Sequence, residues 1–146
     1  MPRRSTAITR WRRASKARTL APTLLAGGPV LPRIRAVLLG WIELAAEQDE
    51  PRGCLIANTA GELLPRDREV ADAVREVLSV VEDGFLQGLR AAARTGEVPD
   101  SLDLPACAAM LTMLLEGLQV LMKADPDPRR FVRAVDTALA SIAARA

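Results

Sequence analysis

The chain has 146 residues, enough for one domain with a hydrophobic core of modest size. Apolar residues make up 49% of it, which excludes a disordered polar chain, and two cysteines without any histidine argue against a zinc site. Residues 1–35 contain nine Arg or Lys and no acidic residue, whereas residues 36–146 carry a net charge of −7, so only the N-terminal end favours a polyanion.

The first 29 residues differ in composition from the rest of the chain. They contain seven Arg or Lys, three prolines and a Gly27-Gly28 pair, and no apolar period extends over three helical turns. We therefore expect a basic, mobile arm over residues 1–29, with at most a short helix around residues 8–20. A solvated tail is favoured over a non-specific phosphate binder. Residues 30–146 are expected to form the folded domain.

Two helices are predicted at the start of this domain. Apolar residues recur at three- and four-residue steps after Val30, which predicts a helix over about residues 31–48 with Pro32 in its first turn. Residues 53–64 then predict a short and largely buried helix, which Pro65 ends.

The third predicted helix is the longest and the most clearly amphipathic. Asp67 is suited to cap its start, and Gly96 stands where a left-handed residue is wanted at its end. With about 28 residues it is expected to be roughly 40 Å long, at a rise of 1.5 Å per residue. Its apolar stripe consists of Val70, Val74, Val77, Leu78, Val81, Phe85 and Leu89.

The last two predicted helices form an antiparallel hairpin. Asp103 caps the first, Leu104–Lys123, which is apolar on nearly every face although it contains Glu116 and Gln119. We interpret it as a core helix rather than a membrane span, and a second chain is expected to cover the faces that one chain leaves open. The second runs from Pro128 to Ala144, with Asp127 as its cap.

A Gly-Cys-Leu-Ile-Ala-Asn run lies at residues 53–58, shortly before Asp67 opens the long amphipathic helix. This run and its surroundings resemble the sensing domain of TetR/AcrR-type transcriptional regulators. The resemblance covers about residues 32–142, and the matching segments follow one another in the same order as in the family. The segments that carry it are 52–60, 62–63, 95–98, 102–104 and 115–119.

The resemblance implies an all-helical, five-helix domain of the TetR C-terminal regulatory type. Its last two helices would pack against their mates as a four-helix bundle in a homodimer, through Glu116, Leu118, Leu121, Met122, Phe131, Val132, Val135, Leu139 and Ile142. It also implies a pocket for a small apolar or amphipathic effector between the earlier helices and the start of the bundle. The pocket walls by position are Leu38, Trp41, Cys54, Asn58, Val77, Val81, Phe85, Met110, Met113 and Leu114.

Several of these residues have a second interpretation. Core packing explains Trp41, Phe85, Met110 and Met113 as well as a pocket does. Asn58 suits a solvated helix edge better than a ligand contact. Glu116, in an apolar helix, must be paired, hydrogen-bonded or at a wet edge, and we expect an interface edge near Arg130 or Arg133 rather than the ligand cavity.

The N-terminal end departs from the family pattern. A TetR-type regulator begins with a domain whose helix-turn-helix enters the major groove of DNA. The segment before the first predicted helix lacks the apolar scaffold of such a unit, so we expect the DNA-reading domain to be absent. A truncation, a misplaced start and an off-frame stretch are the alternative origins of the arm. The protein would then contact DNA only through a helix-turn-helix that is missing from this sequence or that a partner supplies.

These features together predict the ligand-sensing, dimerising core of a TetR-type transcriptional repressor, cytoplasmic and without a cofactor. Two alternatives stay open. One is a reader-less partner that heterodimerises with a full-length regulator and inhibits it, and the other is a small-molecule-binding helical dimer unrelated to transcription. No enzyme is predicted, because the chain has no histidine and its serines lack the setting of a nucleophile. No metal site and no contact with a membrane are predicted.

Overall fold

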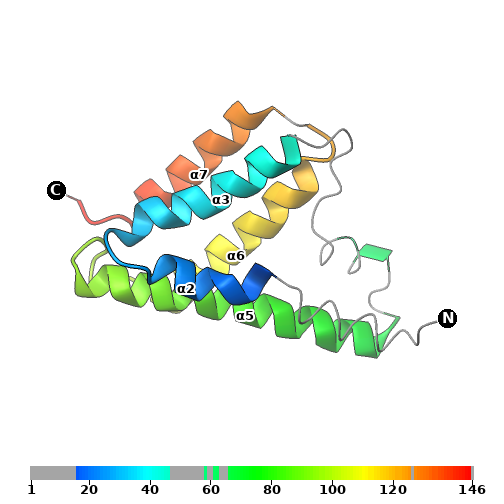
Figure 1. Ribbon diagram of the computed structural model, residues 1–146. Coiled ribbons are helices and arrows are strands. Elements are labelled where there is room, and N and C mark those ends of the chain that lie inside the picture. Colours follow the sequence, from blue (N-terminus) through cyan, green and yellow to red (C-terminus); the bar gives the residue numbers. More distant parts are fainter. Residues whose placement is uncertain (1–15, 47–57, 59–60, 63–65, 126, 146) are drawn as a thin grey trace.

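The fold is known from a computed structural model, which describes residues 16–46, 58, 61–62, 66–125 and 127–145. The helices are η1 (Lys16–Thr19, a 3-10 helix), α2 (Leu20–Leu24), α3 (Val30–Ala46), α5 (Arg68–Arg94), α6 (Leu104–Leu121) and α7 (Pro128–Ile142). In Figure 1, the short η1 and α2 lie along the long helix α5, and α3 and α7 lie side by side with α6. The predicted all-helical class is confirmed.

The three caps expected from the sequence are present. In each case a carboxylate oxygen accepts a hydrogen bond from a backbone N–H of the first turn: Asp67 from Val70 at 3.1 Å, Asp103 from Ala106 at 3.1 Å, and Asp127 from Arg129 at 3.0 Å. The helices α6 and α7 each end two residues before the predicted end, and the predicted end of α3 lies outside the described residues. Most of the helix predicted over residues 53–64 lies outside the described residues.

The end of α5 sets the direction of the chain toward α6. Gly96 has a φ of 75°, a left-handed conformation that glycine adopts without a steric penalty. Its N–H donates to the Ala93 carbonyl at 3.2 Å, and the Glu97 N–H donates to the Ala92 carbonyl at 2.9 Å. This pair of bonds is the Schellman arrangement, so the predicted role of Gly96 is confirmed.

Residues 17–28 belong to the folded body, unlike the mobile arm expected over residues 1–29. Leu20 and Leu24 are buried members of the main hydrophobic core. They lie directly over Gly84 and Gly88 of α5, where a Cβ atom would come within 3.0 Å of Leu20 and 2.9 Å of Leu24. The two glycines therefore let α2 approach α5 closely. Residues 1–15 lie outside the described part of the chain.

The main core joins all the longer helices. Phe85 of α5 and Phe131 of α7 are its largest fully buried side chains, and Ile34 and Leu38 of α3 and Leu111 of α6 are buried beside them. Because α5 presents one face to α2, α3 and α6, its buried residues organise the packing of the whole domain.

Glu97 connects three segments at one corner of the fold. Its carboxylate accepts from the Val30 N–H at 2.8 and 2.9 Å and from the Leu31 N–H at 3.0 Å, so it caps α3 from a distant part of the sequence. The Thr95 hydroxyl donates to the same carboxylate at 3.1 Å. The Glu97 backbone carbonyl accepts from the Ala144 N–H at 2.8 Å, which holds the chain after α7 against this corner.

This geometry makes the stability of the domain depend on the charge of Glu97. Burial of the carboxylate acts to raise its pKa, but the hydrogen bonds from Leu31, Val30 and Thr95 outweigh burial and lower the pKa below the ordinary value of a glutamate. A carboxyl whose pKa is lowered on folding stabilises the fold at pH values above its unfolded pKa, and this contribution is lost as the pH falls through the folded pKa.

We therefore expect Glu97→Ala to lower the free energy of unfolding by about 1–2 kcal/mol at neutral pH. Urea unfolding of both proteins at pH 7 and at pH 3 measures the effect. The difference should shrink at the lower pH, because protonation weakens the wild-type interaction there. Glu97→Gln keeps an acceptor oxygen and should lose less at pH 7. An equal loss at both pH values would show that the charge of Glu97 does not matter.

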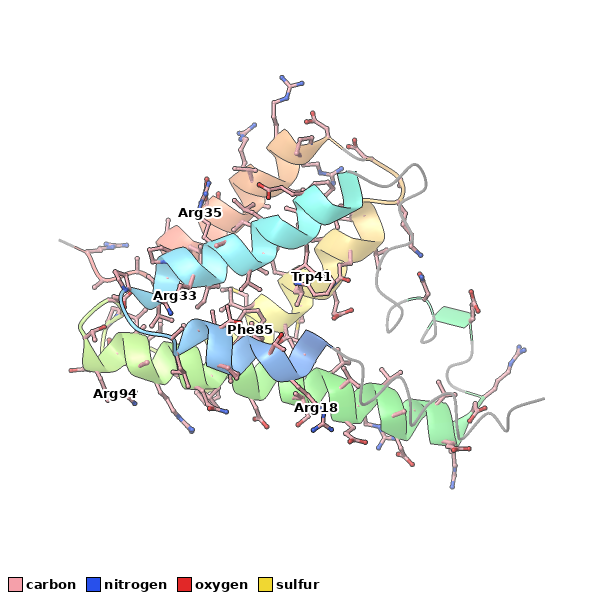
Figure 2. The ribbon with its side chains drawn as sticks, in the orientation of Figure 1. Arg18, Arg33, Arg35, Trp41, Phe85 and Arg94 are labelled. Carbon is pink, nitrogen blue, oxygen red and sulfur yellow. The ribbon has the colours of Figure 1, made fainter. Side chains whose placement is uncertain are left out.

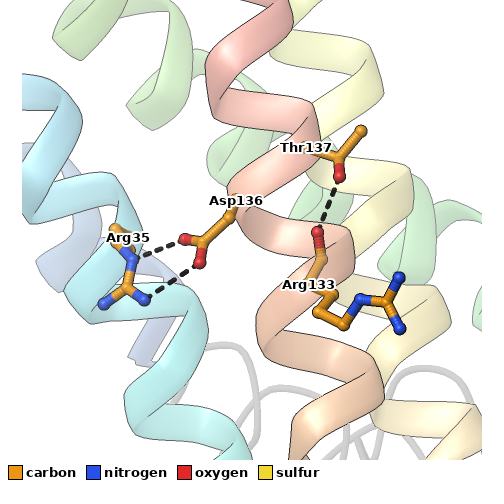
Figure 3. A network of polar contacts seen from close by, with 4 residues as sticks. All are labelled: Arg35, Arg133, Asp136 and Thr137. Atoms are coloured by element: carbon orange, nitrogen blue, oxygen red, sulfur yellow. Dashed lines mark hydrogen bonds and ion pairs between the residues drawn. The ribbon is translucent and has the colours of Figure 1, made fainter.

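An ion pair joins α3 to α7 on the opposite side of these helices from the core. The Arg35 guanidinium donates to both carboxylate oxygens of Asp136, at 2.6 and 3.2 Å (Figure 3). The hydrogen bond from Arg35 lowers the pKa of Asp136, and the reciprocal bond raises the pKa of Arg35. Both side chains are about half exposed, so the pair orients the two helices more than it stabilises them. Within α7, the Thr137 hydroxyl donates to the Arg133 carbonyl at 2.8 Å (Figure 3).

Candidate functional site

Six of the ten residues predicted for the pocket meet in the core. Leu38, Val81 and Phe85 are buried there, and Trp41, Met110 and Leu114 pack against it and keep partial exposure. They come from α3, α5 and α6, and Figure 2 shows Trp41 on the C-terminal half of α3 and Phe85 on α5. The structure thus collects apolar side chains from three helices, with adaptable Met and Trp residues among them.

Of the other four predicted pocket residues, three are described, and they are placed differently. Val77 is buried on α5 but is not part of the main core cluster. Asn58 is half-buried, and its side-chain oxygen accepts a hydrogen bond from Lys123 at the end of α6. Cys54 lies outside the residues that the structure describes.

Met113 is on the outer surface of α6, which corrects its assignment to the pocket wall. Its side chain is 72% exposed. Successive helical residues are rotated by about 100°, so Met113 lies on the opposite side of α6 from the buried Leu111 and Leu115. Helical periodicity does not predict this position, because α6 is apolar on nearly every face.

Two polar residues on the inner side of α6 were not among the predicted site residues. Thr112 and Gln119 are the only polar side chains that are buried in the described part of the chain. The Thr112 hydroxyl donates to the Ala108 carbonyl at 2.9 Å. Thr112, Glu116 and Gln119 follow one another at i, i+4 and i+7, so they form one polar edge of the helix. This spacing is the sequence signal from which they could be predicted.

Neither cysteine chemistry nor metal binding is supported at this site. Cys107 is a free, half-buried thiol of α6. Burial raises its pKa, and the negative charge of Asp103 raises it further, so the thiol stays protonated at neutral pH. Within the described residues, no group of three His, Cys, Asp or Glu is arranged to hold a metal ion.

Most of the predicted interface residues are buried inside the chain itself. They are Leu118, Met122, Phe131, Val135, Leu139 and Ile142. The apolar stripe of α7 packs against α3 and α6 of the same chain, because an amphipathic helix first buries its apolar face against the nearest apolar neighbour. Of the remaining three, Glu116 and Val132 are half-buried and Leu121 is 43% exposed.

The exposed apolar surface lies on α6 instead. We define the α6 outer face as Met113, Gly117, Val120 and Leu121. Met113 and Val120 are 72% and 50% exposed. Of the four large apolar side chains exposed among the described residues, only Leu25 lies elsewhere. By length and composition α6 would suffice to cross a membrane, but its inner face packs in the helical core.

The comparison with known families agrees with this architecture. The family described as "Tetracyclin repressor-like, C-terminal domain" matches residues 30–138, which is most of the chain. The chain belongs to this family. It is a family of transcriptional regulators rather than enzymes, and the TetR resemblance of the sequence is thereby confirmed.

A curated relative of this TetR-family domain is the "Uncharacterized HTH-type transcriptional regulator YezE" of Bacillus subtilis (strain 168). The two are 29% identical over 117 residues, which is 80% of this chain and 60% of the relative. The TetR-family domain described here therefore spans three-fifths of the length of that regulator.

Two solved structures share the fold. A TetR-family transcriptional regulator from Cytophaga hutchinsonii superimposes with a TM-score of 0.69 at 15% identity, over 88% of this chain and 66% of that one. A TetR transcriptional regulator from Chloroflexus aurantiacus J-10-FL gives a TM-score of 0.68 at 21% identity, over 97% and 70% of the two chains. At these identities the likeness establishes the fold alone.

Proposed function

We propose that this chain is the effector-sensing and dimerisation region of a TetR-type transcriptional repressor that acts in the cytoplasm. The observation that carries the proposal is the division of α6 into two faces. Its inner side contributes to an apolar core with buried polar groups, and its outer face exposes large apolar side chains. One helix with these two faces suits a domain that binds a small apolar or amphipathic molecule inside and a second copy outside.

A homodimer is the partner that this surface fits best. Met113, Val120 and Leu121 recur at i, i+7 and i+8, so they lie within reach of one another along one side of α6. Gly117 lies between them and has no atom outside its helix within 4 Å of its would-be Cβ, so a neighbouring helix can approach closely there. A twofold contact of α6 with its own copy, extended by α7, would cover this face.

The segment before α3 provides a second element of the proposal. Leu20 and Leu24 hold α2 on α5, and α5 also supplies Val81 and Phe85 to the core. A molecule that displaces α5 would therefore also displace α2. In a TetR-type regulator the DNA-reading domain precedes the regulatory domain in the chain, so a contact between α5 and the segment before α3 supports a sensing role.

Sedimentation equilibrium of the wild type and of Met113→Glu tests the dimer. We expect the wild type to be a dimer and the variant to dissociate at least about 30-fold more readily, which corresponds to about 2 kcal/mol for an apolar residue at the centre of an interface. Helix content by circular dichroism should stay unchanged, because Met113 makes little contact within its own chain.

Leu25→Glu is the matched control, since Leu25 is also exposed but lies outside α6. It should sediment as the wild type does. A dimer of Met113→Glu with wild-type affinity would contradict the proposed interface. A monomeric wild type would contradict the homodimer and would favour a heterodimer with a full-length relative.

A further inference from the structure

A directional contact holds α3 and α7 together at the solvent edge of their packed faces. The Arg35 guanidinium donates from Nε to Oδ1 of Asp136 at 2.6 Å and from Nη2 to Oδ2 at 3.2 Å. Arg35 directly follows the fully buried Ile34, and Asp136 directly follows the fully buried Val135. The ion pair therefore closes the edge of the apolar seam between the two helices.

The pair constrains the orientation of α7 more than the stability of the fold. Both side chains are about half exposed, and ion pairs at such positions contribute little to the free energy of folding. A guanidinium that binds both oxygens of one carboxylate nevertheless fixes the geometry of the two groups, whereas apolar contacts are non-directional. Arg35 thus limits the rotation of α7 about its own axis.

The other side of α7 is available to a second chain. Figure 3 shows Arg133 and Thr137 on the side of α7 away from Arg35, and both are exposed. The Thr137 hydroxyl already donates to the Arg133 carbonyl at 2.8 Å, so a second chain can cover it without the loss of this hydrogen bond. Because Asp136 and Thr137 are consecutive, the contact that fixes Asp136 also fixes the direction in which Thr137 points.

The same pair connects α7 to a helix of the candidate pocket. Leu38 of α3 is fully buried in the core three residues after Arg35, and Trp41 packs against the core three residues further on. At 1.5 Å per residue, Arg35 and Trp41 are about 9 Å apart along the helix axis. A molecule that displaces this part of α3 would therefore move Arg35, and Asp136 would move with it.

We infer that Arg35 is a positioning residue for dimerisation. Its contact with Asp136 sets how α7 faces the second copy, and it couples that face to the position of α3. The inference rests on the proposed dimeric, sensing function and adds the contact through which the pocket and the dimer affect one another. Coupling between two sites is reciprocal, so formation of the dimer also acts on α3.

Sedimentation equilibrium of Arg35→Met is the first test. Methionine keeps an unbranched side chain but removes the charge and both hydrogen bonds. We expect the dissociation constant of the dimer to rise by about 3–10-fold, with the helix content by circular dichroism unchanged. Asp136→Asn should have a similar effect, and the double variant should be no weaker than Arg35→Met, because the two residues act through one contact. An unchanged dissociation constant in both single variants would overturn the inference, and so would additive losses in the double variant.

Arg75→Met is the matched control. Arg75 pairs with Asp72 at 3.0 Å, but both residues belong to α5 and are more exposed. The change removes the same charge without affecting α7, so the dissociation constant should stay within about two-fold of the wild type. A weakening equal to that of Arg35→Met would show that the loss of positive charge, and not the orientation of α7, weakens the dimer. That result would also overturn the inference.

The second test uses Trp41 as a reporter of α3. The sequence contains two tryptophans, so Trp11→Phe leaves Trp41 as the single one. Dilution through the dissociation of the dimer should change the fluorescence emission of Trp41 in this background, because the coupling is reciprocal. Adding Arg35→Met should abolish this change, whereas adding Arg75→Met should preserve it. No change in the Trp11→Phe protein, or a change that persists with Arg35→Met, would overturn the assigned coupling.

The failure of this inference and the failure of the proposed function can be told apart. If Met113→Glu dissociates the dimer while Arg35→Met and Asp136→Asn leave it intact, the dimer stands and the role of Arg35 falls. A monomeric wild type overturns the dimeric function itself, and the inference with it.

Discussion

Phe85→Ala should lower the free energy of unfolding by about 3–5 kcal/mol. Phe85 is fully buried on α5 and belongs to the core cluster that joins α2, α3, α5, α6 and α7. The loss combines the transfer of the ring from water with the cavity left in its place. Since small domains are stable by only about 5–15 kcal/mol, the variant should lose a large part of its stability.

Chemical denaturation at equal protein concentration measures this loss, because dimerisation couples stability to concentration. Phe85→Leu keeps most of the volume and should lose only about 1–1.5 kcal/mol. If the cavity persists, benzene should raise the Tm of Phe85→Ala and leave the wild type unchanged. A loss below about 1 kcal/mol for Phe85→Ala would show that the ring is not packed as the structure has it.

Gly88→Leu should destabilise the domain by about 1–3 kcal/mol, because it overpacks the contact between α5 and α2. A Cβ at this position would already lie 2.9 Å from Cδ1 and 3.3 Å from Cβ of Leu24, and 3.4 Å from Val30. A full leucine side chain has no free volume there, so α2 must leave α5. Leu20 and Leu24 would then lose their burial.

Gly40→Leu is the matched control for this prediction. Gly40 is exposed within α3, with no atom within 4 Å of its would-be Cβ, so leucine should stabilise its helix by up to about 1 kcal/mol. Trypsin should cleave after Arg18 faster in Gly88→Leu than in Gly40→Leu, since Arg18 lies in η1, two residues before α2 begins. Equal cleavage and an unchanged free energy of unfolding would contradict the close packing of α2 on Gly88.

The contact between α2 and α5 also shows why the basic arm was assigned too far along the chain. Leu20 and Leu24 stand one helical turn apart in a segment too short to sustain a helical period over three turns. Their partners, Gly84 and Gly88, are spaced by four residues within a helix whose apolar stripe runs through Phe85. Only the folded arrangement brings the two pairs together.

The candidate pocket was predicted in part. Leu38, Val81 and Phe85 follow from helical periodicity, because a residue on the apolar side of an amphipathic helix is buried whichever neighbour covers it. Met113 was misplaced and Gln119 was missed for one reason. On a helix that is apolar nearly all round, composition does not tell the inner side from the outer side.

What the sequence determined by itself was the helical class, the three aspartate caps, the turn at Gly96 and the TetR family. These features depend on interactions between residues a few positions apart, and such interactions can be predicted from the order of residues along the chain. Only the tertiary structure decided that α7 buries its stripe within its own chain, that α6 exposes Met113 and encloses Gln119, and that Glu97 caps α3. Each of these depends on contacts between segments distant in sequence, and the same local pattern is compatible with several such contacts.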